Sequence, residues 1–151
     1  MNELKAKVYQ SALTLLKEKN RLLKEERNTM LEGILEETKS SAGDKFETSR
    51  EMMTQDLMTL ELQIKQSKVD LDEIQRLQAI KETSPTVQEG SMIKLGSDWF
   101  MLAVSVGQIN VEDKKVYMLS KNSPLGQLLL GKKKNDQVNF RGKNQPIEEL
   151  L

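Results

Sequence analysis

Two carboxylates, Asp44 and Glu47, are the residues of this chain best placed to do chemistry. They lie three residues apart and follow Ser40-Ser41-Ala42-Gly43, a short break between two long helical patterns. At that spacing on a helix both side chains share one face, so they could bind one Mg²⁺ together. Mg²⁺ prefers six oxygen ligands, and two carboxylates would therefore hold it only as part of a larger set. The same pair also resembles a capping box, in which Asp44 caps the second helix.

The composition excludes most other catalytic groups. The 151 residues contain no histidine and no cysteine, which rules out Ser-His-Asp triads, thiolate zinc sites and disulfides. Basic and acidic residues number 23 each, so bulk attraction to nucleic acid or to a membrane is not indicated. The longest apolar run, Trp99 to Val104, is far shorter than the roughly 20 residues that span a bilayer. We therefore expect a cytoplasmic protein with no membrane partner and no small-molecule substrate.

Residues 1–82 predict an antiparallel coiled-coil helical hairpin with its tip near residues 38–47. This stretch contains no proline, and its apolar residues recur at steps of three and four. The cleaner seam is in the second helix, where Ser67 fills one position among Met53, Leu57, Leu60, Ile64, Leu71, Ile74 and Leu77. Each arm of about 36 residues would be about 54 Å long. A helix with one narrow apolar stripe must protrude or pair with another chain.

The pattern changes at Thr83-Ser84-Pro85-Thr86, because Pro85 cannot continue the helix. We expect a linker over residues 83–90 and, over 91–151, a small antiparallel sheet domain with one short helix, which makes the fold class α+β. The predicted strands are 91–95, 99–106, 116–120, 137–140 and 145–150. The predicted helix is 124–130, with Ser123 as N-cap and Pro124 at its first position. Much of the core is expected from Trp99, Phe100, Tyr117 and Phe140.

Charge is unevenly distributed. Residues 5–27 carry seven basic and three acidic side chains, whereas residues 32–56 carry seven acidic and three basic ones. A solvated coiled coil explains this distribution, and so does a hairpin whose acidic end approaches a cation while its basic flank approaches an anion. Lys132-Lys133-Lys134 likewise fits either a solvated loop or a contact with nucleic acid or an acidic surface.

Residues 120–132 read SKNSPLGQLLLGK, and Asn135-Asp136-Gln137-Val138 follows them. The first run resembles the S-x-x-S-P-x-G-x-A-L-L-G-K signature of the Gre transcript-cleavage factors of bacterial RNA polymerase, and residues 135–138 stand where that family usually has G-D-x-V. The end of the chain, residues 146–150, is similar to the family's last strand. In the family's tip, G-D-L-S-E-N-A-E-Y, the Gly, the Asp and the first Glu match Gly43, Asp44 and Glu47, whereas residues 48–51 differ. The resemblance covers nearly the whole chain.

This resemblance implies a hairpin followed by an FKBP-like domain, and a transcription elongation factor that docks at the rim of the polymerase's secondary channel. Ser123 and Pro124 match the docking loop. Asp44 and Glu47 would share Mg²⁺ with RNA polymerase and stimulate cleavage of backtracked nascent RNA, so that the chain completes an active site without being an enzyme itself. Lys17, Arg21 and Lys24 could contact phosphates of the RNA 3′ segment, although a solvated helix face also explains them.

Three alternatives stay open. A non-catalytic regulator would dock in the same channel and use its altered tip to modulate or inhibit the polymerase. An FKBP-like peptidyl-prolyl isomerase or chaperone is suggested by the expected sheet domain, although fold alone does not give function. A plain coiled-coil module would dimerise through the hairpin seams.

Overall fold

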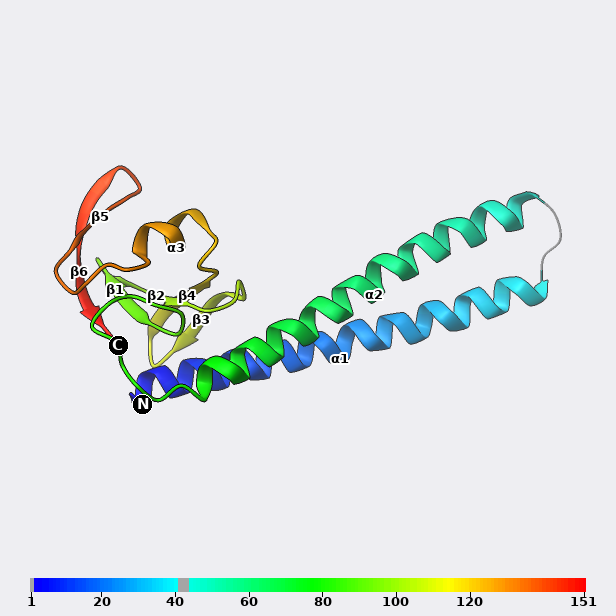
Figure 1. Ribbon diagram of the computed structural model, residues 1–151. Helices are drawn as coiled ribbons and strands as arrows, with labels where there is room; N and C mark the ends of the chain where they lie inside the picture. Colours follow the sequence, from blue (N-terminus) through cyan, green and yellow to red (C-terminus); the bar gives the residue numbers. More distant parts are fainter. Residues whose placement is uncertain (1, 41–43) are drawn as a thin grey trace. The chain divides into compact units, whose positions relative to one another are not determined.

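The computed structural model describes the backbone of residues 2–40 and 44–151, and the side chains of these residues outside 37–48 (Figure 1). Two helices come first, followed by a six-stranded, mostly antiparallel sheet and one short helix, which confirms the predicted fold class. The elements are α1 (Glu3–Ser40), α2 (Asp44–Gln78), β1 (Met92–Leu95), β2 (Asp98–Leu102), β3 (Gly107–Val111), β4 (Lys114–Leu119), α3 (Pro124–Leu129), β5 (Gln137–Phe140) and β6 (Lys143–Leu150).

Contacts between residues divide the chain into two compact units. The sheet unit comprises Met1–Leu15 together with Leu71–Leu151, and the hairpin unit comprises Leu16–Asp70. The sheet unit therefore includes the beginning of α1 and the end of α2. The domain limits at residues 82 and 91 were inferred from sequence pattern alone and stay a prediction.

In the hairpin unit, α1 and α2 pair along the predicted seam. Leu60, Ile64 and Ser67 of α2 are buried, and Leu57 and Met53 are half-buried. A polar layer interrupts the seam, because the Asn20 side-chain amide donates to Ser67 Oγ at 2.7 Å. An ion pair joins the two helices further along, with 3.8 Å between Arg27 and Glu61. The heptad pattern therefore predicted the buried face of α2 correctly.

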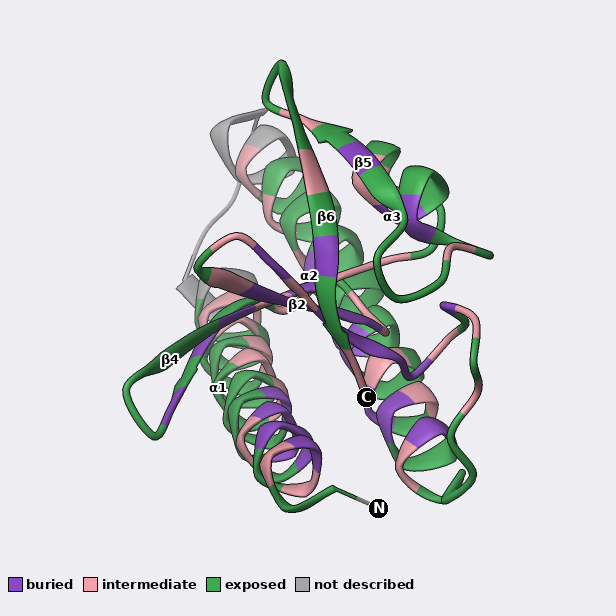
Figure 2. Ribbon diagram, turned by 90° about the vertical axis from the view of Figure 1, so that its left-hand side faces the viewer, coloured by how far each residue is buried: buried purple, intermediate pink, exposed green. Residues whose placement is uncertain are grey.

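The strand order in the sheet unit is β3-β4-β2-β1-β6-β5. All neighbours are antiparallel except β2 and β4, which run parallel and pair Trp99 with Val116 and Met101 with Met118. Alternation along a strand sends successive side chains to opposite faces, and in the central strands β1 and β2 consecutive residues are buried (Figure 2 colours the residues by burial). The two faces must therefore be covered by different elements.

One face of the sheet forms a core with α3. Its buried residues are Val87, Ile93, Leu95, Phe100, Leu102, Leu129, Val138 and Ile147. Phe100 stacks on Tyr117 and meets Phe140 edge-on, with 5.5 Å between ring centroids in each pair. Trp99 is also buried, but it points to the opposite face, because it precedes Phe100 on the same strand. The expected aromatic core is thus divided between two faces.

The opposite face carries Met92, Trp99, Met101, Val116 and Met118, all buried. The two helix ends in the same unit supply buried apolar residues of their own, namely Val8, Tyr9, Ala12, Ile74 and Leu77. Polar contacts tie α1 to the sheet domain as well: the Lys5 ammonium donates to the Leu151 carbonyl at 3.3 Å, and Lys7 pairs with Glu112. We infer that the helix ends cover this face of the sheet.

One predicted strand boundary was wrong, and one strand was not predicted. The strand expected over 99–106 ends at Leu102, and β3, which the sequence did not predict, follows at Gly107. The Val106 N–H donates to the Val104 carbonyl at 2.9 Å, which forms a three-residue turn inside the segment predicted as one strand. Helix α2 ends at Gln78, within the segment 1–82 that was predicted to form the hairpin.

Candidate functional site

The Ser-Pro motif folds as a tight turn that begins α3. Ser123 is the N-cap with extended backbone, and its Oγ accepts from the Gly126 N–H at 3.1 Å and donates to the Ser120 carbonyl at 2.6 Å. Pro124 follows at the first helical position and is exposed. Both predictions for this helix start are confirmed, and the turn presents a rigid proline to solvent.

Gly126 shows why the motif needs glycine at this place. A Cβ built on Gly126 would lie 2.2 Å from the Ser120 carbonyl oxygen and 2.9 Å from Ser123 Oγ. No side chain fits at 2.2 Å from a backbone atom, so the first turn of α3 packs directly on the chain that precedes it. The S-x-x-S-P-x-G run is therefore one folded unit, and its spacing has a structural reason.

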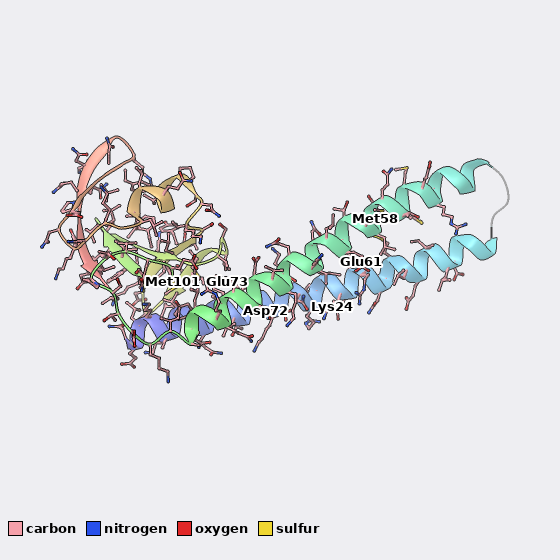
Figure 3. The ribbon with its side chains drawn as sticks, in the orientation of Figure 1. Lys24, Met58, Glu61, Asp72, Glu73 and Met101 are labelled. Atoms are coloured by element: carbon pink, nitrogen blue, oxygen red, sulfur yellow. The ribbon has the colours of Figure 1, made fainter. Side chains whose placement is uncertain are left out.

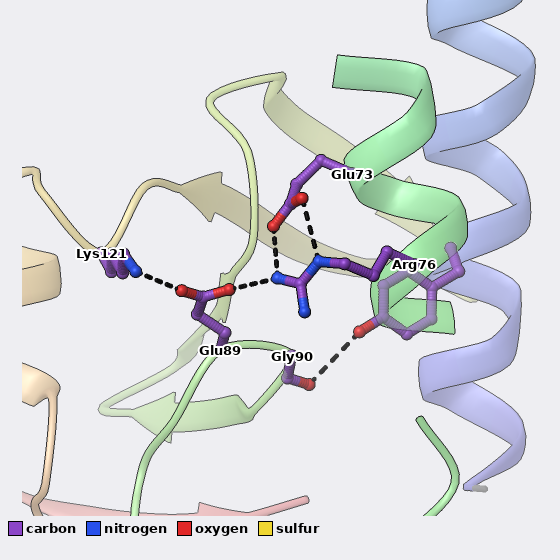
Figure 4. A network of polar contacts seen from close by, with 6 residues as sticks. Glu73, Arg76, Glu89, Gly90 and Lys121 are labelled. Carbon is purple, nitrogen blue, oxygen red and sulfur yellow. Dashed lines mark hydrogen bonds and ion pairs between the residues drawn. The ribbon is translucent and has the colours of Figure 1, made fainter. Parts of the chain in front are cut away.

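A chain of ion pairs connects this turn to the end of α2 (Figure 4). The carboxylate of Glu89 lies 2.5 Å from the Lys121 ammonium and 2.5 Å from the Arg76 guanidinium. Arg76 also makes two parallel bonds to Glu73, at 2.5 and 3.0 Å. Glu89 thus links the motif residue Lys121 to α2 through the segment between α2 and β1.

The network shifts the titration of its members. A hydrogen bond from Lys121 is the largest influence on Glu89 and, with Arg76, holds the pKa of this carboxyl below its usual value. The hydrogen bond from Arg76 likewise lowers the pKa of Glu73. Sequence analysis missed Glu89 and Arg76. Only the i,i+3 spacing of Glu73 and Arg76 gave a local signal, since the other partners lie far apart in the chain.

The predicted basic flank of α1 (Lys17, Arg21 and Lys24) is partly compensated by ion pairs. Arg21 contacts Glu18 at 2.6 Å and Glu25 at 2.9 Å, so its charge is compensated on its own helix. Lys17 and Lys24 are exposed, and Figure 3 shows Lys24 on α1. Contact of Lys17, Arg21 and Lys24 with RNA stays a prediction.

The side chains of Asp44 and Glu47 lie outside the described residues, although α2 begins at Asp44. Their role in binding Mg²⁺ therefore stays a prediction. Within the part of the chain that is described, no group of three or more acidic residues could hold a metal ion. Among the same residues, no helix is long and apolar enough to cross a membrane.

Comparison with known proteins gives structural neighbours only. No family model matches the chain, and none of the curated proteins matches it. Its fold is similar to a solved structure of the transcription factor Gfh1, with 16% identity, a TM-score of 0.36 and 93% of each chain covered. Gfh1 of Thermus aquaticus has 16% identity and a TM-score of 0.33, and the alignment covers 93% of this chain and 94% of that one. GreA factor homolog 1 of Thermus thermophilus has 14% identity and a TM-score of 0.33, with 95% and 94% covered.

Proposed function

We propose that this chain is an accessory factor of bacterial RNA polymerase that binds in the secondary channel and regulates elongation. The observation that supports it best is the turn at residues 120–126, whose sequence resembles the Gre docking loop and whose fold leaves Pro124 exposed. A helical hairpin precedes the sheet domain in the order that the resemblance implies.

In this proposal the two parts of the chain have separate tasks. The sheet domain binds the rim of the channel through Ser123 and Pro124, and the hairpin enters the channel. Asp44 and Glu47 then contribute two carboxylates beside those of the polymerase, which fits the donor preference of Mg²⁺ and the need for further ligands. Bound there, the ion would stabilise negative charge on reacting phosphate oxygens during cleavage of backtracked RNA.

Cleavage assays on stalled elongation complexes test the catalytic part. Asp44→Asn and Glu47→Gln should each abolish stimulated cleavage, because an amide is a neutral and weaker metal ligand, while binding to the polymerase is retained. Glu51→Gln, which removes an acid one helical turn beyond Glu47, should behave as the unmodified protein does. The catalytic role is refuted if the unmodified protein does not raise cleavage above the polymerase's own rate.

A non-catalytic regulator is the second candidate. It is favoured by one sequence observation, the departure of residues 48–51 from the Gre tip pattern after Glu47. Such a factor would co-purify with the polymerase and slow elongation without raising RNA cleavage. Elongation rates measured with and without the chain, beside the cleavage assay, separate the two candidates.

A pocket in the described part of the sheet unit, beside Tyr9, Leu77 and Gly90, has a volume of about 10 Å³. This is about the space of one water molecule, so this pocket does not fit the proline ring that a prolyl isomerase would bind.

A further inference from the structure

The C-terminal end of α3 exposes two leucines. Leu128 is 48% exposed and Leu130 is 46% exposed, and Pro124 lies one helical turn before Leu128. In this helix Gly126 and Leu129 supply the buried contacts. A single exposed leucine is ordinary, but three exposed apolar residues within seven positions indicate a contact surface.

Three consecutive lysines follow these leucines on a backbone that is firmly held. Strand-like hydrogen bonds join Val87 to Gly131 at 2.9 Å and to Lys132 at 2.8 Å. The next turn is closed twice, because the Lys133 N–H donates to the Asp136 carboxylate at 2.8 Å and the Asp136 N–H donates to the Lys133 carbonyl at 3.0 Å. The lysines are therefore displayed by an ordered turn and not by a loose loop.

Within the described part of the chain, no ion pair compensates the charges of these three lysines. Lys7 and Lys121 each have a carboxylate partner. For Lys132, Lys133 and Lys134, by contrast, no ion pair occurs among the residues that the structure describes, and Lys133 and Lys134 are exposed. A compact positive charge thus lies next to the exposed leucines in the chain, and the two together form what we call the leucine–lysine surface (Leu128, Leu130 and Lys132–Lys134).

The combination of groups points to a protein as the partner. Nucleic acid would use the lysines through its phosphates but would leave both leucines in water. A protein segment with aliphatic side chains next to Asp or Glu would satisfy both, since apolar contact supplies affinity and complementary charge supplies rate and register. We propose that the leucine–lysine surface binds an acidic segment of the polymerase that also carries aliphatic side chains. The proposal rests on the function above and extends docking beyond Ser123 and Pro124.

Affinity for purified bacterial RNA polymerase, measured with the full chain at low and high salt, tests this proposal. Lys133→Glu/Lys134→Glu should weaken binding about tenfold at low salt and flatten the salt dependence, because complementary charge becomes repulsive. Leu128→Gln/Leu130→Gln should also weaken binding about tenfold but leave the salt dependence unchanged. The controls are Lys114→Glu/Lys115→Glu on β4 and Leu15→Gln on α1, which also change exposed side chains and should retain affinity.

The outcomes distinguish a failure of the proposed function from a failure of the leucine–lysine surface. Unmodified protein that fails to bind polymerase would overturn both the proposed function and the leucine–lysine surface. Unmodified protein that binds, together with variants that bind equally well and keep the same unfolding midpoint, would overturn the surface alone. A parallel titration with single-stranded RNA and duplex DNA covers the remaining case: if the lysine variant loses nucleic-acid binding while its polymerase affinity is unchanged, the surface binds nucleic acid and the proposal is wrong.

Discussion

Gly126 ties the Ser-Pro motif to its fold at the scale of a single residue. Gly126→Ala would place a methyl group 2.2 Å from the Ser120 carbonyl oxygen, so the turn must open. We expect a loss of about 1–3 kcal/mol in unfolding free energy, as in other overpacked sites. Urea titration measures it.

Gly33 provides the matched control for this substitution. It lies within α1, and a Cβ there would meet nothing within 4 Å. Gly33→Ala should therefore stabilise the protein by about 0.5–1 kcal/mol through helix propensity. If both alanine variants change stability by the same amount and sign, the close contact at Gly126 has no energetic importance.

The sequence predicted the N-cap of α3 but not the ion pairs around Glu89. A serine followed by proline is a local helix-start signal, and Ser123 and Pro124 were assigned correctly from it. The bridging position of Glu89 depends on three separate segments meeting in space, and no local pattern encodes such a meeting. The predicted role of Asp44 and Glu47 in binding Mg²⁺ is a different case, because their side chains lie outside the residues that the structure describes.

The ion-pair network joins elements, and its effect should depend on pH. The carboxylate form of Glu89 is the form that its partners stabilise, since its pKa is lowered chiefly by the Lys121 hydrogen bond. Its contribution is therefore fully present above 4.5, the ordinary pKa of glutamate, and is lost as the pH falls through the lower folded-state value. We expect unfolding midpoints of the unmodified protein to fall more steeply below pH 4.5 than those of Glu89→Gln.

Glu82→Gln is the control for the pH experiment, because Glu82 is exposed and forms no ion pair within the described part of the chain. Unfolding midpoints of Glu82→Gln should fall below pH 4.5 as steeply as those of the unmodified protein. If the unfolding midpoints of the unmodified protein and of Glu89→Gln change with pH in parallel, the network does not couple α2 to the turn at Lys121.

The polar layer between α1 and α2 is expected to set the register of the hairpin. Ser67→Ala leaves the half-buried Asn20 amide without its 2.7 Å acceptor and should destabilise the protein by about 1–2 kcal/mol. Asn20→Leu combined with Ser67→Ala should recover that loss, because both polar partners are then gone. A double-mutant cycle measures the coupling between the two residues, and a coupling of zero would contradict their pairing.

At the scale of elements, long patterns were predicted better than short ones. The seam of α2 repeats over many turns, so its buried face was evident. Strand β3 was missed because its exposed positions, Gln108 and Asn110, are not typical of strands and because the segment before it, predicted as one strand, contains a turn.

At the scale of the whole molecule, the sequence placed a change of pattern at Pro85, but contacts unite both sides of it. Residues 1–15 and 71–80 pack in the same compact unit as the sheet. Contacts between segments so distant in the chain are not visible in local periodicity, on which the predicted division into hairpin, linker and sheet domain was based.

The burial of both sheet faces has a practical consequence for anyone who dissects this protein. A fragment that starts at residue 91 would lack Val8, Tyr9, Ala12, Ile74 and Leu77. Because we infer that these residues cover one face of the sheet, we expect Trp99, Met101 and Val116 to meet water in such a fragment. We expect such a fragment to aggregate and to bind hydrophobic dyes strongly. Joining residue 15 to residue 71 through a short glycine bridge should instead yield a soluble miniature with a cooperative melt. If the fragment 91–151 is soluble and melts cooperatively, the helix ends are not needed to cover this face of the sheet.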